Sequence, residues 1–153
     1  MRKLLFFISL VLFVSFAFSF DIYGGYNYVF TPESTINSFF DASFDFPLNT
    51  NNGTQFGFSL SLLTINKDED NFFFSLMTYG KYDTPTSSGI FSVFGKGGAI
   101  FPANFQFSSI GYAIFAGIRY YFQKFFVGFS YEVIYLYDNI KIDAIPVQFG
   151  YSF

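Results

Sequence analysis

Large apolar side chains occupy every second position over much of this chain, and this alternation restricts the fold more than any other feature. The stretch FFDASFDF, residues 39–46, carries rings at Phe40, Phe44 and Phe46, with Asp41 and Asp45 between them. The stretch TQFGFSLSLLT, from Thr54, repeats the pattern. Successive side chains of a strand point to opposite faces, whereas an amphipathic helix repeats every 3.6 residues. The sequence therefore predicts β-strands.

The clearest hairpin is the segment IGYAIFAGIRYYF-QK-FFVGFSYEVIYLY, residues 110–137. If Gln123 and Lys124 form a two-residue turn, the apolar faces of both strands match, as a hairpin register requires. The same register places Arg119 opposite Gly128, which leaves room for the guanidinium to reach a carboxylate.

Extending the alternation along the chain predicts eight strands. Their approximate ranges are 21–30, 38–46, 54–64, 71–82, 88–95, 109–122, 125–137 and 144–153. Segments of about ten residues match the length that a tilted strand needs to cross a bilayer. The even number also agrees with the bacterial single-chain outer-membrane barrels.

The apolar face carries the largest side chains, which decides what that face contacts. The chain has 28 Phe and 12 Tyr, and only 12% of its residues are charged, about half the usual ~25%. A soluble domain of 153 residues has too little interior for so many rings. The fold expected is all-β, a closed antiparallel up-and-down transmembrane β-barrel with rings facing lipid and small or polar residues facing a narrow lumen. A soluble sandwich, or a secreted barrel that binds lipid with its aromatic face, is the alternative.

Tyrosines near the expected strand ends suit the aromatic girdles of such a barrel. The set is Tyr23, Tyr26, Tyr28, Tyr79, Tyr82, Tyr120, Tyr135, Tyr137 and Tyr151.

The N-terminus predicts export. Arg2 and Lys3 precede an apolar run from Leu4 to Phe20, and Ala17 and Ser19 have the spacing of a signal-peptidase site. We expect a signal peptide over 1–19 and one barrel domain over 20–153; an uncleaved membrane anchor is the alternative. From residue 20 onward there are six basic and eleven acidic residues, a net charge of −5, which gives no support for nucleic-acid binding.

The segment GIRYYFQKFFVGFSYE, the alternating strands and the final PVQFGYSF resemble the eight-stranded outer-membrane β-barrel proteins of the small OmpX/OmpA type. The resemblance implies a place in the bacterial outer membrane, with both termini and the Gln123-Lys124 turn in the periplasm. It places the outer loops at about 31–37, 65–70, 96–108 and 138–143. In that family an aromatic final strand is recognised by the barrel assembly machinery, so Phe149, Tyr151 and Phe153 are the expected insertion signal.

Four ionisable residues are expected to face the lumen: Asp41, Asp45, Arg119 and Glu132. An isolated charge in a narrow lumen is costly, so these groups should pair or keep water. The lumen of an eight-stranded barrel is just wide enough for its own side chains. The favoured interpretation is a polar plug in a small outer-membrane protein with a structural or surface-interaction role. A channel for small solutes or hydrophobic compounds is the first alternative.

Little in the sequence points to catalysis. The chain has no His and no Cys, which excludes serine-histidine hydrolysis and the usual zinc and thiolate sites. Asp41 and Asp45 are four residues apart on one strand, about 13 Å, which is too far to share a proton. The loop INKDED offers Asp68, Glu69 and Asp70 but lacks calcium-loop spacing. No catalytic residue, metal ligand or cofactor is predicted, and the expected partners are outer-membrane lipid and the assembly machinery.

Overall fold

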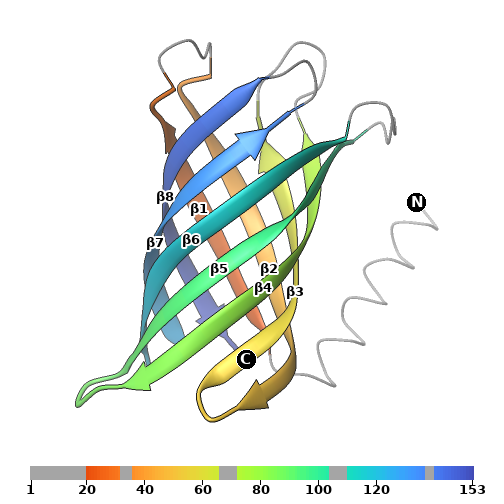
Figure 1. Cartoon of the computed structure of the whole chain (residues 1–153). Helices are drawn as coiled ribbons and strands as arrows, with labels where there is room; N and C mark the ends of the chain where they lie inside the picture. The colour runs from red at the N-terminus through yellow and green to blue at the C-terminus, as the bar shows by residue number, and fades with distance from the viewer. Residues whose placement is uncertain (1–19, 32–35, 66–71, 104–109, 137–139) are drawn as a thin grey trace, which may run out of the picture.

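The structure is a computed structural model that describes residues 20–31, 36–65, 72–103, 110–136 and 140–153. Eight strands form one closed barrel in sequence order, each antiparallel to the next, and β8 closes onto β1 (Figure 1). They are β1 (Asp21–Val29), β2 (Ser38–Asn51), β3 (Thr54–Thr64), β4 (Phe73–Pro85), β5 (Ile90–Pro102), β6 (Gly111–Phe122), β7 (Phe125–Tyr135) and β8 (Lys141–Ser152). Within these ranges no helix is long and apolar enough to span a membrane. The predicted up-and-down barrel of eight strands is confirmed.

The two ends of the barrel differ in their connections. Three short connections, β2–β3, β4–β5 and β6–β7, lie at the end where β1 starts and β8 stops, here called the turn end (Figure 1). Asn52, Gly53 and Gln123 have positive φ there, as two-residue hairpin turns require. The predicted Gln123-Lys124 turn is confirmed, with Phe122 paired to Phe125. The other connections lie at the opposite end, here called the loop end.

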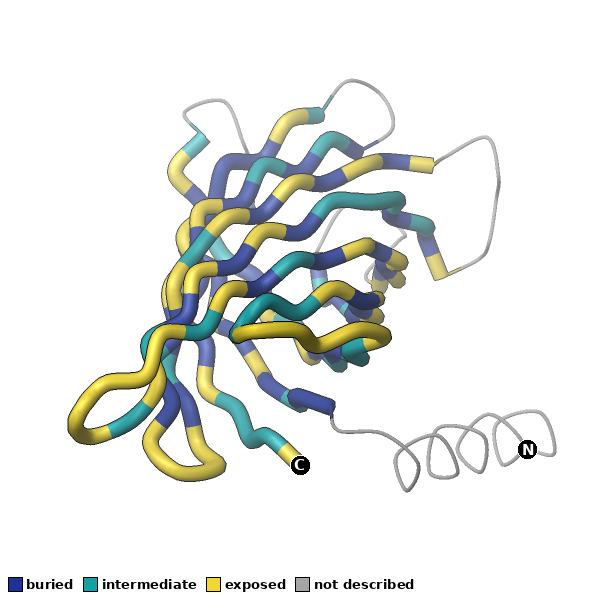
Figure 2. The backbone as a smooth tube through the Cα atoms, turned by 60° about the horizontal axis from the view of Figure 1, so that its bottom comes forward, coloured by how far each residue is buried: buried dark blue, intermediate teal, exposed yellow. Residues whose placement is uncertain are grey.

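Burial alternates from residue to residue along most of the barrel wall (Figure 2), which indicates side chains that point in turn to the lumen and to the outside. In β4 the exposed positions Phe74 and Leu76 alternate with the buried positions Phe73, Ser75 and Met77. The outward face therefore carries large apolar groups, and the barrel interior holds the buried polar side chains together with a set of apolar ones. This arrangement suits a surface that contacts hydrocarbon, not water.

A continuous row of rings surrounds part of the turn end. Neighbouring ring centroids in this aromatic row lie 4.5–6.4 Å apart. The row runs over β2, β1, β8, β7 and β6 through Phe44, Phe46, Phe20, Phe153, Tyr151, Phe125 and Phe122. Phe20 and Phe153 stack at 4.5 Å, so the row crosses the junction where the first strand meets the last.

The predicted length of β5 is wrong. The expected strand 88–95 and outer loop 96–108 are replaced by a strand that runs through Lys96 to Pro102 and pairs with both β4 and β6. The glycines that suggested a loop serve close strand packing, because a Cβ on Gly98 would lie 2.2 Å from the Leu76 carbonyl oxygen. β2, β4 and β8 also extend beyond their predicted bounds, so Lys141–Asp143 belongs to β8 and not to a loop.

One position in the barrel wall lacks a backbone donor. The Ser152 amide donates to the Lys124 carbonyl at 2.7 Å. The backbone N–H and C=O groups of every second residue of β8 counted from Ser152, a set that includes Pro146, are therefore directed toward β7. Pro146 has no N–H, and the pairing of β7 with β8 is interrupted between Phe129↔Val147 and Glu132↔Ala144. Side chains span the interruption: Gln148 donates to Ser130 at 3.3 Å, and Tyr131 donates to Asp143 at 2.7 Å.

Candidate functional site: the lumen

Arg119 and Asp45, two of the four residues expected to face the lumen, lie at the centre of a buried network of charges. Arg119 Nη1 lies 2.9 Å from Asp45 Oδ2, and the two side chains are only 1% and 2% exposed. Gly128 lies opposite Arg119, and a Cβ there would come within 2.8 Å of the arginine Cγ. Because Gly128 has no side chain, the aliphatic part of the Arg119 side chain fits over it, as the predicted hairpin register indicated.

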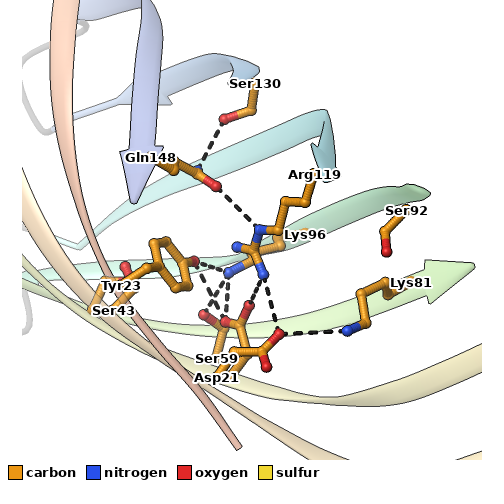
Figure 3. Close-up of polar contacts among 12 residues, drawn as sticks. Asp21, Tyr23, Ser43, Ser59, Lys81, Ser92, Lys96, Arg119, Ser130 and Gln148 are labelled. Atoms are coloured by element: carbon orange, nitrogen blue, oxygen red, sulfur yellow. Dashed lines mark hydrogen bonds and ion pairs between the residues drawn. The ribbon is translucent and has the colours of Figure 1, made fainter. Parts of the chain in front are cut away.

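Lys96 joins this network from β5 (Figure 3). Its Nζ lies 2.5 Å from Asp45 Oδ1 and 3.1 Å from the Ser59 hydroxyl, and it also contacts the Tyr23 hydroxyl. Asp45 is therefore held by two cations. Sequence analysis missed Lys96 because it assigned residues 96–108 to a loop. The signal that was available is its spacing, since Lys96 is in phase with the buried Ser92 and Phe94.

A second group of charges lies beside the first. Lys81 Nζ is 3.4 Å from Asp21 Oδ2, 3.7 Å from Asp83 Oδ2 and 3.1 Å from the Tyr121 hydroxyl. Arg119 links the two groups, because its Nη1 is also 3.6 Å from Asp21 (Figure 3). Lys81 and Asp21 were missed as well. Both residues lie at positions where the alternation of β4 and β1 directs the side chain into the lumen, and this pattern would have predicted them.

Aromatic rings surround the guanidinium of Arg119. Its Cζ lies 4.2 Å from the ring centroid of Tyr23, 4.4 Å from that of Phe94 and 4.8 Å from that of Phe126. The faces of aromatic rings attract cations, most strongly where water is excluded. The prediction that Tyr23 and Tyr79 lie in an interfacial girdle is wrong, because both are buried at 5% exposure. Inward tyrosines supply hydroxyls and ring faces to charges that the narrow lumen encloses, as Tyr23 does here.

Asp41 and Glu132, the other two residues expected in the lumen, lie in the inward phase of β2 and β7 but do not join the ion pairs. Asp41 accepts hydrogen bonds from Asn27 Nδ2 at 2.8 Å and from the Ser43 hydroxyl at 2.9 Å. Glu132 accepts one from the Ser130 hydroxyl at 3.3 Å. Among the described residues, neither carboxylate has a cation within 4 Å.

The lumen is polar toward the turn end and apolar toward the loop end. A cluster of buried apolar residues, here called the apolar layer, fills the loop end. It includes Phe39, Leu63, Phe73, Ile100, Ile134 and Ile142, each 0–2% exposed. At the turn end, a cavity of about 160 Å³ borders Asp21, Gln55, Tyr79 and Lys81. The cavity borders the charge network, since Asp21 and Lys81 belong to both.

The three residues predicted as an insertion signal lie at the turn end of β8. Phe149 is 63% exposed and Phe153 is 57% exposed, so both rings point outward. Tyr151 packs edge-on against Phe153 and Phe125, with centroids 4.7 and 5.1 Å away. The predicted signal peptide, Tyr137 and the acidic loop residues Asp68, Glu69 and Asp70 lie outside the described residues.

No protein-family model and no curated protein matches this sequence. Solved structures do match. A de novo designed transmembrane β-barrel aligns with a TM-score of 0.60 at 10% identity, over 88% of this chain and 95% of the other. The N-terminal β-barrel domain of Pseudomonas aeruginosa OprF gives 0.57 at 19% identity, over 88% and 97%. Neisserial surface protein A, NspA, gives 0.53 at 12% identity, over 89% and 97%.

The closed sheet, the apolar outer wall and the filled lumen define a transmembrane β-barrel. More particularly, the chain has the fold of the small outer-membrane barrels, with eight strands that all run antiparallel to their neighbours. At these identities the likeness concerns the fold and carries no assignment of activity.

Proposed function

We propose that this protein is a small, non-enzymatic integral protein of the bacterial outer membrane, exported by a cleaved signal peptide, with a structural or surface-interaction role. The observation that carries the proposal is the closed lumen. The charge network around Arg119 and the apolar layer fill successive parts of the interior. A barrel of this kind offers its outer wall and its loops, not a pore, to other molecules.

The outer wall supports the membrane location. Its exposed positions carry large apolar side chains from all eight strands, among them Tyr28, Phe40, Phe56, Leu76, Val93, Ile114, Phe129 and Phe149. Such a surface would aggregate in water and is stable against hydrocarbon. The fold shared with the N-terminal β-barrel domain of OprF and with Neisserial surface protein A agrees with this placement.

Conductance measurements test the proposal against a small-solute channel. We expect the barrel, folded in detergent and added to planar bilayers, to produce no current steps under conditions in which a trimeric porin does. Regular steps from the wild-type barrel would favour the channel. Recovery of the protein in the culture medium, and not in the membrane fraction, would favour the secreted lipid-binding barrel.

The aromatic end of β8 supports a further part of the proposal, insertion by the barrel assembly machinery. Phe149 and Phe153 point outward and are available to a partner, whereas Tyr151 packs against Phe153 and Phe125 within the aromatic row. Before the barrel closes, a strand with alternating rings is well suited to recognition by strand pairing, in which backbone bonds give affinity and side chains give specificity.

A further inference from the structure

The lumen contains more negative than positive charge. Five carboxylates and three cations among the described residues face inward, which leaves a net charge of −2. The inward carboxylates are Asp21, Asp41, Asp45, Asp83 and Glu132, and the inward cations are Lys81, Lys96 and Arg119. Asp21, Asp45 and Asp83 share the three cations. The uncompensated charge therefore lies on Asp41 and Glu132.

Asp41 and Glu132 point into the same narrow lumen, and each accepts hydrogen bonds only from neutral donors. Two unpaired carboxylates in a low-dielectric interior are costly unless a cation or a proton neutralises them. The pair thus requires a positive partner that the side chains of the described residues do not provide.

Unused oxygen atoms lie beside the same pair. The Asn27 side chain is 0% exposed, and its Nδ2 is held by Asp41, but its Oδ1 has no partner. The Ser75 hydroxyl is also buried without a partner. Ser75 lies directly opposite Ser61, and Ser61 is linked through Ser43 to Asp41.

There is also space at this level of the barrel. Asp41 is only partly buried although its side chain points inward, so its carboxylate borders volume that side chains do not fill. Gly25 lies opposite Asp41, and a Cβ there would overlap the carboxylate oxygen at 2.2 Å. The absence of a side chain at Gly25 lets the carboxylate occupy this place in the lumen.

We propose that Asp41, Glu132, Asn27 Oδ1 and the Ser75 hydroxyl form a binding site for one divalent cation of the Ca²⁺ type. Carboxylate, amide and hydroxyl oxygens are the ligands of hard cations, and two carboxylates balance one divalent charge. Ca²⁺ accepts flexible shells of oxygen ligands and water, whereas Mg²⁺ requires near-ideal octahedral geometry. The described residues contain no group of three or more acidic, His or Cys ligands, so neutral oxygens and water complete this site.

Calcium titration of the barrel over residues 20–153 tests the site. The protein is folded in an uncharged detergent, freed of metal with a chelator and titrated with CaCl₂ by calorimetry. We expect one saturable site, with affinity at least tenfold weaker in Glu132→Gln and in Asp41→Asn. Asp143→Asn is the matched control, because Asp143 lies outside the lumen and is paired with Lys141 at 3.0 Å; its affinity should equal that of the wild type.

Thermal unfolding gives a second readout that does not depend on the calorimetric signal. In chelator, Glu132→Gln should unfold at a higher temperature than the wild type, because it removes an uncompensated charge. In Ca²⁺ the order should reverse. Absence of saturable binding, equal binding by wild type and both lumenal variants, or stability that follows pH and ignores Ca²⁺ would overturn the proposal; the last result would show that protons neutralise the pair.

Discussion

Arg119 shows what a single residue contributes to this lumen. Its guanidinium contacts Asp45 and Asp21 and lies against three aromatic rings, and it is 1% exposed. A buried ion pair adds little net free energy compared with a well-packed apolar pair, but removing one partner leaves an unpaired buried charge. The main effect of Arg119 on stability is therefore expected from the uncompensated negative charge that its removal would leave in the lumen.

Replacement of Arg119 by Ala should destabilise the barrel by about 3–5 kcal/mol, because Asp45 keeps only Lys96 and Asp21 keeps only Lys81, the net negative charge of the lumen rises, and a cavity remains. Chemical unfolding of the detergent-folded barrel measures the change. Lys141→Ala is the control: Lys141 also pairs with an aspartate, at 3.0 Å, but its side chain is 46% exposed and its loss should change stability little. Equal effects of the two substitutions would contradict the plug.

The residues of the network were predictable in unequal measure. Asp45 and Arg119 lie in stretches where alternation is unbroken, so their inward direction followed from period two alone. Lys96 follows a glycine and precedes two more, a composition that indicates a loop unless the neighbouring strands are known. Its position depends on pairing with β4 and β6, which is a tertiary property. Pairings across the lumen, such as Lys96 with Asp45, depend on barrel closure and cannot be read from one strand.

At the scale of the elements, β8 combines an interrupted pairing with β7 and a proposed role in membrane insertion. Pro146 interrupts its pairing with β7 in the middle of the barrel wall, where the Ser130 carbonyl lacks a β8 donor. In the hydrocarbon region of a bilayer, no water is available to form hydrogen bonds with backbone polar groups. The Gln148–Ser130 and Tyr131–Asp143 hydrogen bonds hold the two strands together at this level.

Pro146→Val should restore the missing donor and stabilise the barrel by about 1 kcal/mol, the net value of one hydrogen bond. Amide hydrogen exchange at Ser130 and Glu132, whose N–H groups face β8, should slow, since the strands would separate less often. Ile145→Val changes a neighbouring side chain and adds no donor, so it should leave exchange at these amides unchanged. Faster exchange in Pro146→Val would show that the proline relieves strain.

Deletion of Phe153 tests the proposed insertion role of the same strand. We expect less folded protein in the outer membrane of cells, because the last outward ring of the alternating set is lost. Substitution of Phe122, an exposed ring of the same aromatic row on β6, by Ala is the control for general loss of membrane contact. Normal surface levels after the deletion, or equal losses in both variants, would contradict the insertion role.

At the scale of the whole molecule, strand number, strand order and the direction of the faces followed from the sequence. The alternation is a local signal, and up-and-down connection of neighbouring strands needs no long-range information. The division of the lumen into a polar turn end and an apolar loop end was not predicted. It depends on the tilt of the strands, which brings Phe39, Ile100 and Ile142 to one level from distant parts of the chain.

A closed barrel with continuous backbone pairing should resist detergent until heated. We expect the barrel folded in detergent to migrate faster on a gel when unheated than when boiled, together with a β-type circular dichroism spectrum. The boiled sample is the unfolded control for the unheated one. A chain that folds equally well without detergent would contradict the membrane-spanning barrel.

The contact between Phe20 and Phe153 bears on the order in which the molecule assembles. Every other pair of neighbouring strands is joined by a short stretch of chain, but β1 and β8 are neighbours only through closure. Loop-closure entropy rises with the length of chain between contacting residues, so this junction is the most expensive to form. Folding is therefore expected to proceed through seven hairpin-like pairings and to finish with the eighth, when the rings of Phe20 and Phe153 stack. The slowest step of folding would then depend on the stacking of two aromatic rings that take no part in the charge network of the lumen.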